Sequence, residues 1–271
     1  MLDIFNAFVG LLVLAGIGIL IFVKRILDKH GTISAVFVGF LILFMGGWEW
    51  LILLLVFLTT AAIATRYRFE QKSRLGFVEG QTDIRSWRNV FANVAISVAS
   101  AVVLGTTSLE LSSFAFLGAI STSMADTLAT EFGLLNPYQP RLITNLSKRV
   151  PAGTSGGVSP YGMLASLIGS GIMSLAAMLL DFGHFMSSTI LISTFVGGFL
   201  GSLFDSFLGA TVQAKFTCQV CGKIVEKRSH CGRETNHSSG LSIMGNDLVN
   251  FISSLFGATI AVLFLQFSLY R

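Results

Sequence analysis

Residues 188–211 read STILISTFVGGFLGSLFDSFLGAT, a run of 24 residues with a single charged side chain. About 20 predominantly apolar residues are enough for a helix to cross a bilayer. Similar apolar stretches occupy residues 2–23, 33–47, 51–65, 90–104, 112–132, 161–180 and 247–268. Together they predict an all-α polytopic membrane protein with about eight transmembrane helices, which form a single transmembrane domain over residues 1–271.

The composition excludes a soluble domain and a disordered chain. Of the 271 residues, 53% are apolar and 12% are charged, and a soluble domain carries about twice that share of charge. The 28 glycines against 4 prolines are typical of membrane helices, in which small residues let the backbones approach closely.

Two of the stretches, 33–47 and 51–65, are shorter than a bilayer-spanning helix and could form one long kinked helix. We expect two helices, separated around residues 46–50. The first stretch has no basic segment before it and no small-residue cleavage site after it, so we expect it to remain as a helix rather than to be removed as a signal peptide.

The basic residues predict the orientation of the bundle. With eight spans, 17 of the 18 Lys and Arg residues fall on one side of the membrane, and only Arg271 falls on the other. Because cytoplasmic loops carry the excess of Lys and Arg, both termini should lie outside and the long loops 66–89, 133–160 and 212–246 inside. The net charge of +4 therefore reflects orientation, and we expect no nucleic-acid partner. In a prokaryote the protein would lie in the plasma membrane.

Polar side chains gather at the inner ends of four predicted helices. Ionisable groups within a membrane are costly and usually mark a site. Each of these residues alone could equally cap a helix or join two helices, but agreement in depth among four helices favours a shared site. They are Asp126 and Glu131 in the fifth span, Asp205 in the seventh, Asn246, Asp247 and Asn250 in the eighth, and Asn89 and Asn93 in the fourth.

Helical geometry ranks the carboxylates. Asp126 and Glu131 are five residues apart, about 140° around a straight helix, so both cannot point into one cavity. A weak repeat, Gly118-x4-Ser123-x2-Asp126 against Gly197-x4-Ser202-x2-Asp205, could present the two aspartates symmetrically on parallel helices, although chance similarity between Gly- and Ser-rich spans is the better explanation.

A glycine-rich run in the loop after the fifth span suits an anion. Backbone N–H groups of glycines can close on phosphate oxygens, and Lys or Arg side chains offset the remaining charge. The order of a P-loop is missing, and a flexible turn is the alternative. The residues concerned are Arg141, Lys148, Arg149, Gly153, Thr154, Ser155, Gly156 and Gly157.

Carboxylates beside an anion-binding loop predict a magnesium ion and a nucleoside triphosphate, since Mg²⁺ takes one or two carboxylates plus substrate phosphates. Asp126 and Asp205 are the first choices as ligands, followed by Asp247 and Glu131. An acceptor that is itself a phosphate monoester is already ionised near neutral pH, because its second pKa is about 6. No general base is then required.

The last internal loop contains all three cysteines. Cys218-x2-Cys221, His230-Cys231 and His237 could form a small structural zinc site within 212–246, since two thiolates from one turn need two ligands from another. Unliganded thiols are the alternative, because adjacent residues such as His230 and Cys231 rarely both ligate one ion.

Several ordered motifs resemble the integral-membrane family that includes the phytyl-phosphate kinase of vitamin E salvage. The resemblance covers nearly the whole chain. It rests on Ser123-Met-Ala-Asp126-Thr-Leu-Ala-Thr130-Glu131-Phe-Gly133, Pro140-Arg141-Leu-Ile-Thr144, Val150-Pro-Ala-Gly153-Thr-Ser-Gly-Gly157-Val-Ser159, Gly201-Ser-Leu-Phe-Asp205-Ser206-Phe-Leu-Gly209-Ala-Thr-Val-Gln213, Cys218-x2-Cys221 with His230-Cys231, and Gly245-Asn-Asp-Leu-Val-Asn250.

The resemblance implies a kinase that moves the γ-phosphoryl group of CTP, or of another nucleoside triphosphate, onto a lipid-anchored isoprenoid monophosphate to give the diphosphate. Ser155 stands where the family's Gly-Thr-Asn-Gly-Gly run has Asn, so the nucleotide preference could differ. We expect the isoprenoid tail to enter between helices through glycine-rich faces such as 197–201. The alternatives are a cytidylyltransferase that forms a CDP-lipid and an ion-coupled secondary transporter, which also uses intramembrane carboxylates.

Overall fold

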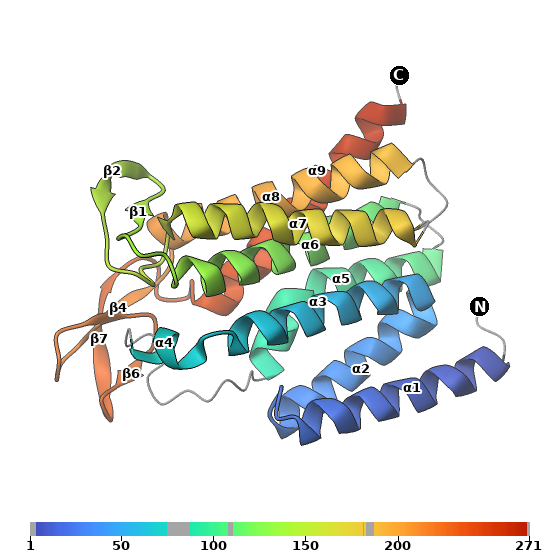
Figure 1. Cartoon of the computed structure of the whole chain (residues 1–271), viewed down its shortest axis with the longest axis horizontal. Coiled ribbons are helices and arrows are strands. Elements are labelled where there is room, and N and C mark those ends of the chain that lie inside the picture. The colour runs from blue at the N-terminus through green and yellow to red at the C-terminus, as the bar shows by residue number, and fades with distance from the viewer. Residues whose placement is uncertain (1–3, 75–86, 108–110, 181, 183–186, 270–271) are drawn as a thin grey trace.

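Eight long helices form the bundle seen in the computed structural model, which describes residues 4–74, 87–107, 111–180, 182 and 187–269 (Figure 1). Each helix coincides with one of the predicted apolar stretches, so the predicted all-α fold is confirmed. Their bounds are α1 Ile4–Val23, α2 Lys29–Gly46, α3 Trp48–Arg66, α5 Trp87–Thr107, α6 Leu111–Gly133, α7 Pro160–Leu179, α8 Ser187–Thr211 and α9 Asn246–Leu269.

The break between α2 and α3 confirms that the two short stretches are separate helices. Gly47 has φ +101° and donates its N–H to the carbonyls of Ile42 and Leu43, which ends α2. A positive φ is adopted freely by glycine and rarely by other residues, so the chain turns here and α3 begins at Trp48.

Within the described ranges, seven of these helices are long and apolar enough to cross a membrane. The exception is α6, whose many Ser and Thr residues lower its hydropathy. This helix lies in the centre of the bundle and contacts α3, α5, α7, α8 and α9. Neighbouring helices rather than lipid surround it, so its polar residues can be satisfied inside the protein.

Small residues bring α6, α8 and α9 into close contact. A Cβ atom added to Gly197 would lie 2.8 Å from the carbonyl oxygen of Gly257 on α9, and one added to Gly201 would overlap Thr122 on α6. The glycine face 197–201 is therefore filled by neighbouring helices, and our expectation that the isoprenoid tail enters there is wrong. Thr122 Oγ1 donates to the carbonyl of Gly118, 2.8 Å away, within the same interface.

The long loops form two small antiparallel sheets at one end of the bundle, where the sequence predicted loops alone. In the first, β1 Arg141–Leu142 lies between β2 Asn145–Arg149 and β3 Gly157–Val158. The second has the order β5-β4-β7-β6, with β4 Lys215–Cys218, β5 Ile224–Val225, β6 Ser229–His230 and β7 Arg233–Ser239. These strands are short and mostly exposed, so the sequence has no sustained alternation of apolar and polar residues that would predict them.

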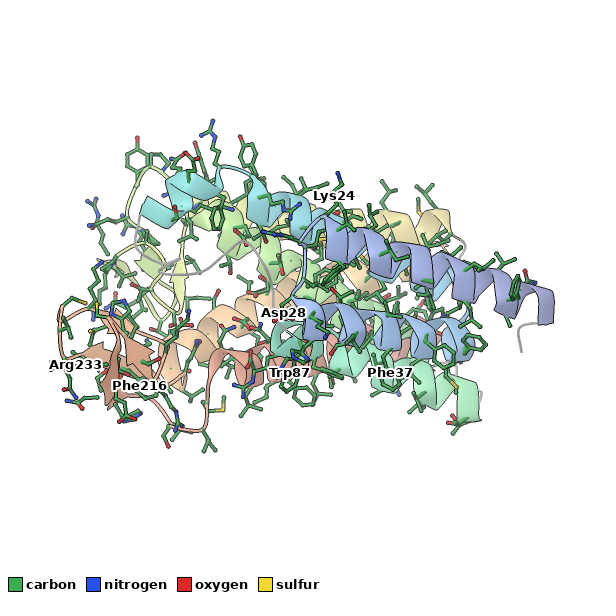
Figure 2. All side chains as sticks on the ribbon, turned by 90° about the horizontal axis from the view of Figure 1, so that it is seen from below. Lys24, Asp28, Phe37, Trp87, Phe216 and Arg233 are labelled. Atoms are coloured by element: carbon green, nitrogen blue, oxygen red, sulfur yellow. The ribbon has the colours of Figure 1, made fainter. Side chains whose placement is uncertain are left out.

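The strands and the short helix α4 Phe69–Arg74 share one end of the molecule, whereas α1 begins and α9 ends at the other (Figure 1). Figure 2 shows Phe216 and Arg233 in the strand region and Phe37 among the helices. Lys24, Asp28 and Trp87 lie between these two levels in the same view. Charged and tryptophan side chains of this kind commonly mark the edge of the hydrocarbon layer, so the strand region projects beyond it.

Candidate active site

Asp126 and Asp205 reach the same level of the bundle because α6 and α8 run parallel and are anchored alike. Gly118 on α6 and Gly197 on α8 both face the backbone of Gly257 on α9. Each aspartate follows its glycine by eight residues, about 12 Å along a helix. Both carboxylates are partly buried, and their negative charges act on each other.

Serine hydroxyls from α6 and α9 connect the helices around these carboxylates. Ser253 Oγ lies 2.9 Å from Asp205 Oδ2 and 2.7 Å from the carbonyl of Val249, so its single proton can be donated to either oxygen. On α6, Ser123 Oγ donates to the carbonyl of Asn93 at 2.5 Å, which ties the start of α5 to the helix that carries Asp126.

The predicted residues at the start of α9 lie at different levels of exposure. Asn246 and Asp247 are exposed in its first turn, and Asn250 is half-buried. The carbonyl of Asn250 accepts a hydrogen bond from Ser254 Oγ at 2.7 Å. In α5, Asn93 is buried, whereas the side chain of Asn89 lies outside the described part of the structure.

Glu131 faces a different neighbour from Asp126, as the angle of about 140° between them predicts. Its Oε2 accepts a hydrogen bond from Lys72 Nζ of α4 at 2.6 Å, and its Oε1 accepts one from Thr65 at 2.8 Å. Lys72 is only 1% exposed and also donates to the carbonyls of Ala64 and Thr65. Glu131 therefore fastens α3 and α4 to α6.

The glycine-rich run 151–157 forms two tight turns. Thr154 N–H donates to the carbonyl of Pro151, and Gly157 N–H donates to the carbonyl of Thr154 at 2.8 Å. Gly156 has φ +79°, and an added Cβ would lie 2.5 Å from the backbone nitrogen of Ala210, so the run packs directly on the end of α8. Among the hydrogen bonds of the described residues, none uses the N–H groups of Gly153, Ser155 or Gly156.

The cations predicted beside this run lie on the exposed hairpin of β1 and β2. Lys148 and Arg149 are exposed in β2, and Arg141 of β1 donates to the carbonyl of Leu146 at 2.5 Å. Lys148 lies near enough to Lys215 of β4 for their charges to repel each other. The two sheets thus bring basic side chains from distant parts of the chain together.

Glu226 links the second sheet to the glycine-rich run, and no motif in the sequence indicated this contact. Its carboxylate accepts a hydrogen bond from Ser155 Oγ, and its charge acts on Asp205 and Lys215. Although its side chain reaches the surface, the groups packed around it withdraw the carboxylate from water and raise its pKa, against the opposing effects of Ser155 and Lys215.

Lys215 and Gln213 complete the lining of this region. Burial lowers the pKa of the Lys215 amine, Lys148 adds to that effect, and Glu226 opposes it. Gln213 is buried, and within the described part of the chain its Nε2 completes no hydrogen bond. That amide lies close enough to Glu226 to influence the pKa of the carboxylate. A buried donor left without an acceptor is costly unless a ligand or water satisfies it.

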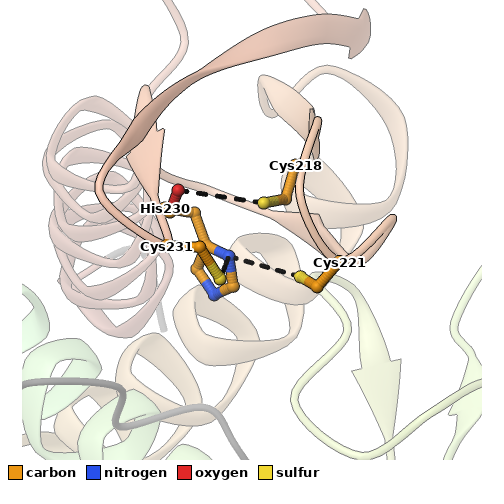
Figure 3. Close-up of side chains that lie close together, drawn as sticks. All are labelled: Cys218, Cys221, His230 and Cys231. Atoms are coloured by element: carbon orange, nitrogen blue, oxygen red, sulfur yellow. Dashed lines mark hydrogen bonds between the residues drawn. The ribbon is translucent and has the colours of Figure 1, made fainter.

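Four of the five residues predicted as zinc ligands meet at one point (Figure 3). One ligand atom from each of Cys218, Cys221, His230 and Cys231 lies within 4.8 Å of all the others. Adjacent His230 and Cys231 both belong to this group, although neighbouring residues rarely ligate one ion together. His237 lies outside it, with its ring edge-on to Phe216.

The surroundings of Cys218 and Cys231 shift the pKa values of their thiols in opposite directions. The backbone N–H of Cys221 donates to the sulfur of Cys218, which lowers the pKa of that thiol to about 6. Loss of hydration has the opposite effect on Cys231 and raises the pKa of its thiol to about 11.

An apolar pocket lies between α1, α2, α3 and α5. Its lining includes Leu14 and Ile21 of α1, Val36 of α2, and Ala61 of α3. Asn93 is the polar residue in this lining, and its carbonyl is bound by Ser123, which precedes Asp126 by one turn of α6. One wall of the pocket therefore borders the helix that carries the first carboxylate.

Comparisons with known proteins give relatives along most of the chain. The family model of the integral membrane protein family DUF92 matches residues 12–258. An uncharacterized membrane protein of Methanocaldococcus jannaschii is 29% identical over 256 residues, 94% of this chain and 93% of that protein. Protein PGR of Arabidopsis thaliana is 32% identical over 86% of each chain, and chloroplastic protein VTE6 of the same plant is 26% identical over 90% of this chain and 66% of its own length. No solved structure matches the chain.

Proposed function

The chain belongs to the DUF92 family of integral membrane proteins, and from this premise we propose that it is a membrane kinase that phosphorylates an isoprenoid monophosphate. The phosphoryl donor would be a nucleoside triphosphate, and CTP is the first candidate. The motifs resemble the family that includes the phytyl-phosphate kinase of vitamin E salvage, and the distant relationship to VTE6 agrees with that resemblance. We place the strand end in the cytoplasm, because the basic residues gather there.

The observation that carries the proposal is the interaction between Asp126 and Asp205 beside the glycine-rich run. Two like charges held together at the end of a membrane bundle repel each other, and a shared cation would relieve that repulsion. The donor set of two carboxylates fits Mg²⁺, which prefers oxygen ligands and retains positions for phosphates. When bound, magnesium would neutralise the charge that develops on the transferred phosphoryl group.

The residues around the carboxylates fit a triphosphate. The N–H groups of Gly153, Ser155 and Gly156 are not used by the turns among the described residues, and the buried amide of Gln213 lies beside Glu226. Lys148 and Lys215 add positive charge on the same side. We propose that these groups hold the donor phosphates while Ser253 orients Asp205.

The chemistry then needs little from the protein beyond position. An oxygen of the acceptor phosphate, ionised near neutral pH, attacks the γ-phosphorus, a new P–O bond forms, and the bond to the β-phosphate oxygen breaks to release the nucleoside diphosphate. The chain supplies alignment of the two phosphates and positive charge around them.

The apolar pocket suits the isoprenoid tail. It is lined almost wholly by aliphatic side chains of α1, α2, α3 and α5, and its polar residue Asn93 lies toward α6. A tail in this pocket would place its phosphate near Asp126. Ala61→Phe should therefore raise the KM for a long-chain isoprenoid phosphate more than for a short one, whereas Leu164→Phe on the exposed face of α7 should change neither. An equal effect on both chain lengths would exclude the pocket as the tail site.

The direct test uses purified full-length protein, Mg²⁺, each of the four γ-labelled nucleotides, and phytyl, geranylgeranyl or farnesyl monophosphate. We expect label in the lipid diphosphate with at least one nucleotide. Asp126→Asn and Asp205→Asn should each abolish turnover in a folded protein, while Glu49→Gln, in the first turn of α3, should not. Release of pyrophosphate with a CDP-lipid product would identify a cytidylyltransferase, and gradient-driven uptake into sealed vesicles without a labelled lipid would identify a transporter.

A further inference from the structure

Three cysteines and one histidine converge in the second sheet, apart from the carboxylates of α6 and α8. Cys218 ends β4, Cys221 lies in the turn that follows, His230 ends β6, and Cys231 comes directly after it (Figure 3). We propose that the sulfur atoms of these three cysteines and Nδ1 of His230 bind one Zn²⁺ ion as a structural site.

The backbone is folded to present these four atoms. Gly222 and Gly232 follow Cys221 and Cys231 with φ of +70° and +72°, and Cys231 itself has φ +51°. The positive φ at Cys231 turns the chain between two adjacent residues, so that both side chains point to the same place. In the first turn, Val220 N–H donates to Cys218 Sγ at 3.4 Å, and Gly222 N–H donates to the carbonyl of Cys218 at 3.0 Å.

The spacing of the ligand atoms fits a tetrahedral ion. With bonds of about 2.3 Å to sulfur and about 2.0 Å to nitrogen, a tetrahedral zinc site separates its ligand atoms by about 3.5 to 3.8 Å. His230 Nδ1 lies 3.5 Å from Cys221 Sγ and 3.3 Å from Cys231 Sγ. Three thiolates and one imidazole form a closed tetrahedral donor set, which selects Zn²⁺ over the hard cations Mg²⁺ and Ca²⁺.

The outer strands of this sheet bury few side chains, although β4 is partly buried. β5 and β6 have two residues each, and most of β7 is exposed. Segments this short rarely fold without a metal, a disulfide or a partner, and the three cysteines are free thiols. The ion would therefore fix the turn that leads to Glu226, which contacts Ser155 of the glycine-rich run. This consequence for the site rests on the proposed function, whereas metal binding does not.

The test is the metal content of the full-length protein, purified in detergent under reducing conditions. We expect about one zinc per chain in the wild type and in His237→Ala, and none in Cys221→Ser or His230→Ala. His237 is the matched control, since it lies in the same sheet but outside the ligand group. Exchange with Co²⁺ should give the visible absorption of a tetrahedral thiolate site in the wild type.

His230→Cys keeps four suitable ligands, so it should fold, retain zinc and shift the Co²⁺ absorption even if Cys221→Ser does not fold. The proposal is overturned if the reduced wild type contains no zinc and binds neither Zn²⁺ nor Co²⁺, or if His237→Ala loses the metal as completely as His230→Ala. A protein that binds zinc but transfers no phosphoryl group would support the metal site and contradict the proposed kinase.

Discussion

The buried Lys72–Glu131 pair allows a structural role for Glu131 to be separated from a catalytic one. Lys72 Nζ has three acceptors, at 2.6 Å in Glu131 and at 2.9 and 2.8 Å in the carbonyls of Ala64 and Thr65, so all three of its protons are used. Lys72→Met removes the cation, while Thr65 still donates to the carboxylate.

Breaking a buried ion pair by removing one partner costs about 3–5 kcal/mol. We take the lower end, about 3 kcal/mol, because the side chain of Glu131 keeps 16% of its exposure and Thr65 still donates to it. For a chain of this size each kcal/mol lowers the Tm by about 2–4 °C, so Lys72→Met should unfold about 6–12 °C earlier than the wild type.

Thermal unfolding of the purified protein in detergent measures this effect. Lys29→Met removes an exposed lysine at the start of α2 and should stay within about 2 °C of the wild type. Lys72→Met with Glu131→Met should recover most of the loss, because the buried carboxylate is removed together with its cation. An unchanged Tm in Lys72→Met would refute this reasoning. A double variant that folds but has no turnover would show that Glu131 is needed for catalysis and not only for stability.

Three further substitutions test the site. Ser253→Ala removes the donor to Asp205, so it should lower kcat/KM about 10–100-fold and weaken the dependence of activity on magnesium. The control is Thr259→Ala, which changes an exposed residue of α9. An unchanged magnesium titration of Ser253→Ala would contradict the role of Ser253. Gly156→Ala places a Cβ 2.5 Å from the backbone nitrogen of Ala210 at φ +79°, so its activity should fall sharply. Gly245→Ala is the control and should keep its activity, because open space surrounds Gly245. Equal activity in the two variants would show that the glycine-rich run tolerates displacement. The pKa of Glu226 is raised in the folded protein, so the stability that this group contributes is full below its ordinary pKa and is lost as the pH rises through the raised value. The Tm of Glu226→Gln minus that of the wild type should therefore increase between acid and neutral pH. A constant difference in Tm across that range would contradict this prediction.

The helices could be predicted because a bilayer sets a length that the sequence must satisfy. The separation at Gly47 followed from the positions of Lys24, Arg25 and Lys29, since fusing α2 and α3 would reverse their side of the membrane. The common level of Asp126 and Asp205 followed from apolar spans that run in the same direction. The length, charge and direction of each span are properties of a single segment, so each can be predicted from that segment's own sequence.

The partners of the carboxylates could not be predicted in this way. Glu226 reaches Ser155 only because two small sheets fold over the end of α8, and no sequence pattern predicts that these sheets lie together. Ser253 did leave a signal, since it lies seven residues after Asn246 and three after Asn250, on one face of α9. Lys72 was hidden, because a lysine in a basic loop predicts an exposed residue rather than a buried partner of Glu131.

The low hydropathy of α6 follows from its position and its task. A helix that carries Asp126 and Glu131 and bonds its neighbours through Ser123 and Thr122 cannot also be apolar enough to face lipid. It is stable in the membrane only when other helices enclose it, as α3, α5, α7, α8 and α9 do here. These five helices therefore take the place of lipid around α6, and the polar residues that a chemical site needs can gather on α6 without contact with hydrocarbon. A count of spans by hydropathy alone would omit the helix on which the proposed chemistry depends.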